Sequence, residues 1–504
     1  METLPRDKNF SSPYVKKYFY FNFHIIICSI WVIIQCALVA YYYTSLKSNS
    51  NISNIVTNLY NGFLFAKVSA LLINFNFMLL FVILNKYIIS LVTNLSYLLP
   101  VNCIVGYHIV INMSILLFSI IHVASHVYNF YIIDGNTWTF NSLKKSTAGI
   151  TGIILVCLYF VVYTFSLRIV RKRFYELFAL SHLLHFGIVI TLLLHGSFCF
   201  FKTDDGRCLS PTFWIYIIIP FTLFIIEKVF REYTSNKKTV FLNIKKYNDN
   251  CSRIEIYKPF FEFKAGQWVL VNCPNISRFQ WHPFTIVSNP IENGKIELLV
   301  KETGTWTKKF TELLYENNFH RDQIKIKVSN PYGYRYDIIT KYRAAVLIAG
   351  GIGITPFISL LKSLPCNLGH GNHNVYLKKV YLFWVCRNIG DFNCFLTELK
   401  EIKNEIDKYG NNKLLSVNLY ITGNSETRNG TVRMSKFPLL QFKEGRPDFD
   451  TIFHDLVTWH PNNDIKLLFC GSKKMNNDIT HKIHKIHNVT NNTKFIFQQG
   501  ETFT

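Results

Sequence analysis

Charged residues are scarce in this chain of 504 residues, and acidic residues are scarcer than basic ones. Asp, Glu, Lys and Arg make up 17% of the sequence, below the roughly 25% of soluble domains, whereas 49% of the residues are hydrophobic. This balance argues against an ordinary soluble enzyme. The net charge is +23, but the sequence lacks a single basic arm with interleaved aromatic residues. Because the charge is spread along the chain, nucleic acid is not an expected partner.

Long uncharged runs occupy the first half of the chain. A helix needs roughly 20 apolar residues to cross a bilayer, and such runs lie near 21 to 43, 62 to 85, 101 to 125, 148 to 168, 175 to 199 and 211 to 230. The first run lacks a small-residue cleavage site, which favours a signal anchor over a cleaved signal peptide. The sequence therefore predicts a cytosolic N-terminus over 1 to 20 and a six-span domain over 21 to 235, embedded in the lipid bilayer.

Basic residues flank the spans on alternate sides, and cytoplasmic loops are enriched in Lys and Arg. They precede the first span, lie between the fourth and fifth at Arg168, and follow the sixth. We therefore expect both the N-terminus and the long C-terminal region in the cytosol, at either the plasma membrane or the endoplasmic reticulum. The far side then holds the glycosylation sequon at Asn51 and a candidate disulfide between Cys199 and Cys208.

Ionisable imidazoles occur inside two of the apolar runs, where hydration is lost. His108 and His122 are about four helical turns apart and lie near one helix face. His182 and His195 are 13 positions apart, so a local bulge or kink, for which Gly187 is the candidate position, is needed to bring both to one face. Because the two spans cross in the same direction, His108 is level with His182 and His122 with His195. Two imidazoles at one depth can ligate one haem iron, so the sequence predicts two stacked haems.

The other intramembrane histidines have simpler explanations. A solitary imidazole in a span usually forms a hydrogen bond to a neighbouring helix or lines a cavity, and we expect this of His24 and His185. His126 lies one turn beyond His122 and cannot bind the same iron. It is a candidate for a cavity-lining group or for part of an acceptor site.

The second half of the chain has the pattern of a globular protein. Segments such as "TVFLNIKKY" and "RIEIYKP", with frequent turn residues, predict an antiparallel β-barrel over 239 to 336. After residue 343 the apolar strand "AAVLIA" leads into "GGIGITPF" and a helix, and further strands alternate with helices. A strand, a Gly-rich turn and a helix place backbone N–H groups against a phosphate. The full G-x-G-x-x-G fingerprint is missing, yet 343 to 504 is predicted to be a doubly wound α/β nucleotide domain.

The ordered motifs of the whole chain resemble the ferric reductase and NADPH oxidase superfamily from about residue 60 onward. After the paired histidines come "WHPFTIVS", "KETGTWT", "NPYGY", "GGIGITPF", "FWVCRN", "GRPDF" and "LLFCGS". The resemblance implies a six-helix transmembrane bundle with two haem b groups. It also implies a ferredoxin-NADP-reductase-like module, in which the barrel binds FAD and the α/β domain binds NADPH.

The resemblance also implies a role for each matched residue. The iron ligands are His108, His122, His182 and His195, and the FAD-binding residues are His282, Pro283, Phe284, Thr285, Lys301, Gly304, Trp306 and Thr307. The NADPH pyrophosphate turn is formed by Gly350, Gly351, Gly353, Thr355 and Pro356, the 2′-phosphate is selected by Arg387 and Arg446, and the nicotinamide lies beside Cys470 and Gly471. The chain ends in "FIFQQGETFT", so the flavin-stacking aromatic corresponds to Phe503. Thr285, Cys470 and Phe503 are the candidate catalytic residues.

The implied activity is electron transfer from cytosolic NADPH through FAD and two haems to an acceptor on the far side. Chelates of Fe³⁺ or Cu²⁺ need only an exposed outer haem edge, whereas reduction of O₂ is helped by a polar pocket, which His126 could form. A likeness to the compact fungal branch of probable metalloreductases favours metal chelates and a role in iron or copper homeostasis. A superoxide-producing oxidase is the second hypothesis, and the oligomeric state is left open.

Two hypotheses of other classes compete with this interpretation. A six-span channel or transporter with a regulatory nucleotide domain would bind no haem and show no Soret band. A haem subunit that depends on a separate reductase is disfavoured by the complete set of flavin and nicotinamide motifs.

Overall fold

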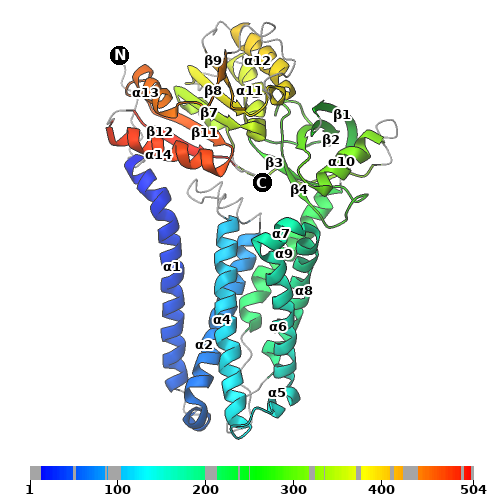
Figure 1. Cartoon of the computed structure of the whole chain (residues 1–504), viewed down its shortest axis with the longest axis vertical. Helices are drawn as coiled ribbons and strands as arrows, with labels where there is room; N and C mark the ends of the chain where they lie inside the picture. The colour runs from blue at the N-terminus through cyan, green and yellow to red at the C-terminus, as the bar shows by residue number, and fades with distance from the viewer. Residues whose placement is uncertain are drawn as a thin grey trace. The chain divides into compact units, whose positions relative to one another are not determined.

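The computed structural model describes residues 13–48, 53–85, 88, 104–198, 213–236, 239–248, 250–316, 324–333, 335–369, 376–408, 414–423, 441–489 and 493–500 (Figure 1). The chain divides into two compact units, Tyr14–Lys228 and Val229–Thr504. Some sequence-based expectations lie outside the described residues, namely those for Asn51, Cys199, Cys208, Phe503 and the His24 side chain.

The first unit is built from long apolar helices. These are α1 (Pro13–Ser48), α2 (Ser53–Leu84), α4 (Ile104–Ile133), α6 (Thr147–Ser166), α8 (Tyr175–Ser197) and α9 (Phe213–Ser235), with the short helices α5 (Asn141–Lys145) and α7 (Arg168–Arg173). Six helices are long and apolar enough to cross a membrane, which confirms the predicted number of spans. Many outward side chains are apolar and exposed, such as Phe160 at 73% and Ile190 at 60%. Lipid rather than water is the suitable surrounding for such a surface.

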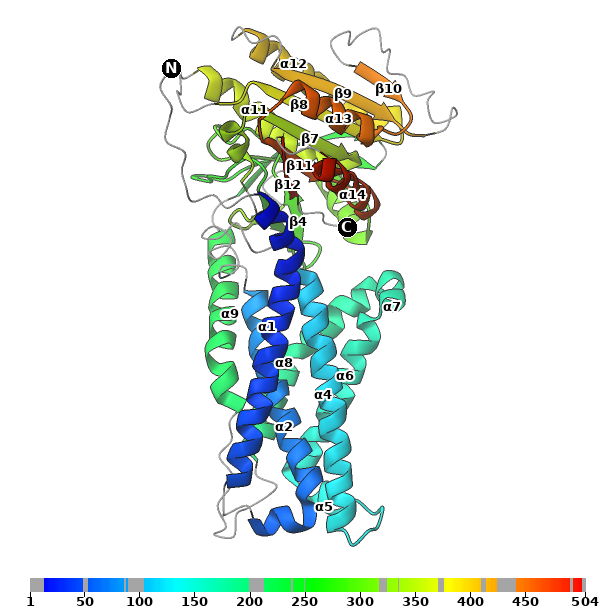
Figure 2. The same ribbon diagram turned by 90° about the vertical axis from the view of Figure 1, so that its left-hand side faces the viewer.

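The helices pack in pairs, with α2 against α4 and α6 against α8 (Figures 1 and 2). Their shared core contains Ile115, Leu155 and Ile188, one residue each from α4, α6 and α8. Asn76 of α2 joins α1, since it accepts a hydrogen bond from Trp31 Nε1 at 3.1 Å. In lipid such polar contacts replace the hydrophobic driving force between helices.

The second unit begins with two antiparallel three-stranded sheets. One contains β1 (Val240–Asn248), β2 (Cys251–Tyr257) and β5 (Lys295–Lys301), and the other contains β4 (His282–Thr285), β3 (Trp268–Asn272) and β6 (Lys327–Val328). Alternation along β2 turns Ile254 and Ile256 inward, where both are fully buried. They share a core with Val269 and with Phe310 of α10 (Thr305–Glu316). These sheets form the predicted barrel.

A parallel six-stranded sheet follows. Its strands are β7 (Ala344–Gly350), β8 (Lys379–Cys386), β9 (Leu415–Ile421), β10 (Gln441–Glu444), β11 (Ile465–Cys470) and β12 (Phe495–Gln499), in the order β10-β9-β8-β7-β11-β12. The 3₁₀ helices are η4 (Asp337–Lys341), η5 (Gly351–Ile354) and η6 (Ile389–Cys394), and the α-helices are α11 (Thr355–Gly369), α12 (Leu396–Lys408), α13 (Phe449–Trp459) and α14 (Lys473–Val489).

Helices cover both faces of this sheet (Figure 1). Buried residues of α11 and α12 share one apolar core with the sheet, and those of α13 and α14 share a second core on the opposite face. The strand order reverses between β7 and β11, and ligands of doubly wound sheets bind outside the carboxyl ends of the strands at such a point. The predicted α/β architecture is confirmed, and it places the motifs at the ends of β7 and β11 side by side.

Candidate functional site

Two of the four predicted iron ligands face each other inside the helix bundle. The rings of His122 on α4 and His195 on α8 have centroids 6.2 Å apart and planes inclined at 75°. Two metal–nitrogen bonds of about 2 Å each, with the distances from nitrogen to ring centre, add up to roughly 6 Å. The separation therefore suits one metal ion held between the two rings.

Hydrogen bonds define which nitrogen of each ring carries the proton. His122 Nδ1 lies 2.9 Å from the carbonyl oxygen of Ala66, which can only accept. His195 Nδ1 lies 3.0 Å from Thr151 Oγ1, and that hydroxyl already donates to the Thr147 carbonyl at 2.8 Å. Both Nδ1 atoms are therefore donors, so each Nε2 has the lone pair that a metal requires.

The other two predicted ligands belong to a second group of imidazoles. His182 Nδ1 donates to the carbonyl of Phe178 at 3.0 Å, which leaves the Nε2 lone pair able to bind a metal. His108 on α4 lies close enough to His182 and His185 for electrostatic interaction. His185 donates its own Nδ1 to the carbonyl of His182 at 2.9 Å, so its hydrogen bond is within its own helix.

Helix α8 is continuous over Tyr175–Ser197, so the bulge expected at Gly187 is absent. His195 faces His122 of α4 without it, and His182 lies within electrostatic range of His108 of α4. Each of the two groups thus supplies imidazoles from two helices. Nδ1 carries the proton where it donates to a carbonyl, as in His122 and His182, or to the Thr151 hydroxyl, as in His195. This donor set fits the bis-histidine ligation of two haem groups.

Sequence reasoning missed a lysine beside the His122 ring. Lys67 on α2 interacts electrostatically with His122 and His126, and the His126 ring centroid is 4.6 Å from that of His122. Asn129, less than one turn further along α4, is fully buried, and within the described residues neither of its amide atoms has a hydrogen-bond partner. A Cβ added at Gly62 of α2 would lie 2.1 Å from Asn129 Oδ1. The sequence did carry a signal for this residue, because Lys67 is the single charge within the apolar run "FLFAKVSALL". An ionisable side chain inside a span costs free energy and therefore indicates a functional site.

The two predicted FAD motifs meet in the barrel. "HPFT" forms β4, which pairs with β3 through Thr285 and Trp268. His282 stacks on Trp306 at the start of α10, with ring centroids 4.0 Å apart and an interplanar angle of 24°. Thr307 Oγ1 accepts hydrogen bonds of 3.1 Å from the backbone N–H groups of Thr303 and Gly304.

The turn before α10 is suited to an anionic ligand. Lys301 ends β5 and is exposed, and an added Cβ at Gly304 would meet nothing within 4 Å. The indole nitrogen of Trp306 is buried and has no hydrogen-bond partner among the described residues, so it can donate to a bound molecule. Together with the positive N-terminus of α10, these groups fit a cofactor pyrophosphate.

The dinucleotide turn connects β7 to α11 and contacts the end of β11. Gly351 has a φ of 55°, which favours glycine. A Cβ added at Gly353 would lie 2.2 Å from the Cys470 carbonyl oxygen, so only glycine fits there. The Cα atoms of Gly350 and Gly471 also approach closely, since a Cβ on Gly350 would be 3.3 Å from Gly471. The structure therefore brings the predicted pyrophosphate and nicotinamide residues together.

Thr355 and Pro356 occupy the first turn of α11, where a missing N–H costs nothing. The carbonyl of Gly351 accepts a hydrogen bond of 2.8 Å from Trp384 Nε1 of β8. Sequence reasoning missed this contact, because nothing in "FWVC" indicates that the tryptophan reaches the preceding turn. Trp384 is almost fully buried and anchors the turn to the sheet.

The two predicted 2′-phosphate residues lie at the same edge of the sheet. Arg387 directly follows β8, Arg446 follows β10, and both are exposed. Only β9 separates these strands, and Glu444 of β10 and Cys386 of β8 both pair with Ile421 of β9. Strands about 4.8 Å apart place the two strand ends roughly 10 Å from each other. That spacing lets two guanidinium groups approach one phosphate.

Comparison with known families covers consecutive parts of the chain. Residues 69–194 match the ferric reductase like transmembrane component, residues 236–335 match an FAD-binding domain, and residues 342–483 match the ferric reductase NAD binding domain.

Similar proteins come from animals and an amoeba. NADPH oxidase 1 of Mus musculus is 25% identical, over 87% of this chain and 86% of that protein. A superoxide-generating NADPH oxidase heavy chain of Dictyostelium discoideum is 27% identical, over 87% of this chain and 68% of that protein. A ferredoxin NADP+ reductase structure from Neisseria gonorrhoeae, with bound FAD and NADP, matches 52% of this chain and 97% of that chain at 15% identity, with a TM-score of 0.37.

Six membrane-crossing helices precede an FAD barrel and a nicotinamide-binding α/β domain, and the family matches follow the same order. The chain therefore belongs to the ferric reductase and NADPH oxidase superfamily and is an NADPH-dependent transmembrane oxidoreductase.

Proposed function

We propose that this enzyme moves electrons from cytosolic NADPH across the membrane to molecular oxygen, which yields superoxide on the far side. The observation that carries this proposal is the polar group formed by Lys67 and His126 beside the His122–His195 pair. Similarity to NADPH oxidases supports it. The sequence alone favoured metal chelates, so the acceptor is the point at which the proposal departs from that expectation.

Four histidines hold the two haem irons in this proposal. His122 and His195 would hold one haem through their Nε2 atoms, and His108 and His182 would hold the other. Bound FAD and haem supply carriers that divide the two electrons of a hydride into single electrons. Thr151 keeps the His195 ring oriented through its hydrogen bond to Nδ1.

The residues of the second unit bind and orient the nicotinamide and flavin. Lys301 and the N-terminus of α10 would bind the pyrophosphate of FAD, and Thr285 of β4 would lie close to its flavin ring. Gly353 lets the turn pack directly against the Cys470 backbone, and Gly351, where an added Cβ would meet nothing within 4 Å, would leave room for the NADPH pyrophosphate. Cys470, at the end of β11 beside this turn, would border the nicotinamide.

Size and charge distinguish oxygen from a metal chelate at the acceptor site. Asn129 is fully buried and Lys67 is partly buried, so a bulky chelate would not reach these side chains directly, whereas a small molecule such as oxygen suits them better. A chelated metal ion would have to react at an exposed edge. In its protonated form Lys67 would also favour an anionic product, since electrostatic interactions strengthen in a medium of low dielectric constant.

The reaction balances without a further reductant. One NADPH gives two electrons and is oxidised to NADP⁺ with release of one proton, and two oxygen molecules take one electron each. The basic clusters around Arg168 and Lys228 support NADPH oxidation on the cytosolic side, because cytoplasmic loops are enriched in Lys and Arg.

The test uses sealed vesicles that contain the full chain and are supplied with NADPH. Cytochrome c reduction that superoxide dismutase abolishes is expected, together with oxygen consumption. His126→Leu and Lys67→Leu should lower this rate about tenfold or more while haem content and NADPH-dependent dye reduction stay constant. Ser125→Ala is the matched control, because the Ser125 hydroxyl donates to the preceding turn of its own helix at 2.7 Å.

A different result would assign the enzyme to metal reduction. If a ferric chelate is reduced at a rate that dismutase does not lower, and His126→Leu leaves that rate unchanged, then oxygen is not the acceptor. The metalloreductase hypothesis from the sequence would then stand.

A further inference from the structure

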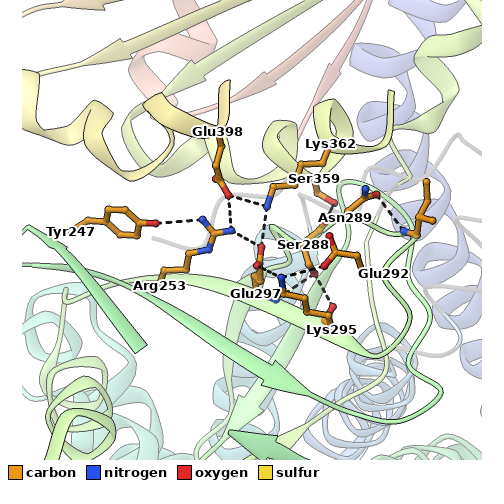
Figure 3. A network of polar contacts seen from close by, with 11 residues as sticks. Tyr247, Arg253, Ser288, Asn289, Glu292, Lys295, Glu297, Ser359, Lys362 and Glu398 are labelled. Carbon is orange, nitrogen blue, oxygen red and sulfur yellow. Dashed lines mark hydrogen bonds and ion pairs between the residues drawn. The ribbon is translucent and has the colours of Figure 1, made fainter. Parts of the chain in front are cut away.

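Five charged side chains meet where the FAD barrel packs against the nicotinamide domain (Figure 3). The barrel contributes Arg253 of β2, together with Lys295 and Glu297 of β5. The nicotinamide domain contributes Lys362 of α11 and Glu398 of α12. Glu297 is 3% exposed, so this group is inside the protein rather than on its surface.

Four of these residues form a closed ring of alternating charge, which we call the charge ring. Arg253 Nη2 lies 2.6 Å from Glu297 Oε2 and 2.7 Å from Glu398 Oε1. Lys362 Nζ lies 2.9 Å from Glu297 Oε2 and 3.3 Å from Glu398 Oε1. Each cation thus contacts both anions, and in each case one of the two anions belongs to the other domain.

A second contact between the domains lies one turn away on the same helix. Ser359 Oγ of α11 donates a hydrogen bond of 2.9 Å to the carbonyl oxygen of Ser288. Ser288 follows the flavin motif that ends at Thr285, and α11 begins at Thr355, directly after the dinucleotide turn. The helix that starts at the NADPH site is therefore tied to the strands that carry the flavin site (Figure 3).

Apolar packing alone does not define this alignment. The same interface buries Val287 and Leu299 of the barrel against Phe357 and Leu361 of α11. Hydrophobic contact is non-directional, so it tolerates sliding of one surface over the other. Ion pairs with fixed hydrogen-bond geometry lose their contacts on such a shift, and buried charges are costly once unpaired.

We propose that the charge ring of Arg253, Glu297, Lys362 and Glu398 is a positioning device that fixes the distance and angle between bound nicotinamide and flavin. Its residues touch neither cofactor in this role and act through α11 and β5. Hydride transfer is sensitive to such alignment, because a misplacement of about 1 Å can cost on the order of a hundredfold in rate. The proposal does not depend on which acceptor the enzyme uses.

The test is NADPH-dependent reduction of a soluble dye, which takes electrons before the membrane part, with the full-length protein. Glu297→Gln and Arg253→Met should lower kcat about tenfold or more, while KM for NADPH changes less than about twofold and bound FAD is retained. Arg253→Lys should recover much of the rate, because it preserves the charge. Trypsin should also cleave faster at the exposed linker residues Lys341 and Arg343, which reports domain movement without any measurement of activity.

Lys295→Gln is the matched control. Lys295 contacts the same carboxylate, Glu297, at 2.9 Å, but both residues belong to the barrel. Its removal should leave kcat and linker cleavage near those of the unaltered enzyme. If the Glu297→Gln protein does not fold and cannot be purified, Glu398→Gln is the substitute variant, because it removes the other, more exposed carboxylate of the charge ring. An unchanged kcat in the ring variants, an equal loss in Lys295→Gln, or a loss that merely follows missing FAD would each overturn the proposal.

Discussion

His195 on α8 donates its Nδ1 proton across the bundle to Thr151 of α6, over 3.0 Å. The Thr151 hydroxyl donates its own proton to the Thr147 carbonyl at 2.8 Å, so it accepts the hydrogen bond from the His195 ring. This contact sets both the tautomer and the ring orientation of His195. A histidine that ligates a metal normally donates its other ring N–H in this way, so the contact fits the predicted role of His195.

Thr151→Val should therefore weaken haem binding at the His195 site while the fold remains. Loss of such a partner typically costs about 10- to 100-fold in metal affinity or activity. The measurement is haem per FAD in the purified protein, with a redox titration of the remaining haem. Thr164→Val is the control, because Thr164 is only partly buried and its hydroxyl bonds to the Phe160 carbonyl of its own helix. Equal effects of the two substitutions would contradict the role of Thr151.

Substitution of the ligands themselves should separate the two haem sites. His122→Leu or His195→Leu should remove one haem, and His108→Leu or His182→Leu the other, because water cannot replace a lost axial ligand inside lipid. NADPH-dependent dye reduction should survive in all four variants. His185→Leu is the matched control and should keep both haems. Unchanged haem content in all four ligand variants would show that the pairing is wrong.

The cofactor preference depends on Arg387 and Arg446. Since two guanidinium groups at one sheet edge suit a phosphate, the enzyme should prefer NADPH over NADH. Arg387→Leu or Arg446→Leu should raise KM for NADPH about tenfold or more and leave that for NADH nearly constant. Lys443→Gln removes one positive charge from β10 itself and should not have this effect. Steady-state kinetics with both nucleotides provides the measurement, and equal use of the two by the unaltered enzyme would refute the assignment.

Gly353→Ala should disrupt the nicotinamide site by collision with backbone. The new Cβ would lie 2.2 Å from the Cys470 carbonyl oxygen, which cannot swing aside as a side chain can. A cost of about 1–3 kcal/mol in unfolding free energy is typical of such overpacking, and NADPH affinity should fall with it. Gly390→Ala is the control, since an added Cβ there meets nothing within 4 Å. Thermal unfolding and NADPH titration measure the two effects.

The stability of the nicotinamide and flavin unit should depend on pH through Glu297. Burial opposes ionisation of this carboxyl, but Lys362, Arg253 and Lys295 outweigh it and lower its pKa to about 2. A depressed pKa stabilises the fold above the ordinary pKa of a glutamate, and this contribution is lost as pH falls toward 2. It is at most about 3 kcal/mol. The difference in thermal unfolding between the unaltered chain and Glu297→Gln should therefore shrink between pH 5 and pH 2, and a constant difference would contradict this.

Much of the architecture follows from the sequence by itself. The six spans are determined because a bilayer requires long apolar helices whatever their neighbours are. The turn around Gly353 follows from local chemistry, because a buried strand, glycines and a helix start combine in few ways. For the same reason the histidines were recognised as candidate ligands, since an imidazole in an apolar run needs a partner.

Tertiary structure alone decided the contacts between distant segments. Nothing near Lys67 in the sequence indicates that it lies beside His126, and nothing near Arg253 indicates Glu398. The match of Thr151 to His195, and the continuity of α8 through Gly187, likewise depend on how helices pack. Local propensity and hydropathy act over a few residues, whereas these pairings arise from the close packing of whole elements, which no short sequence window contains.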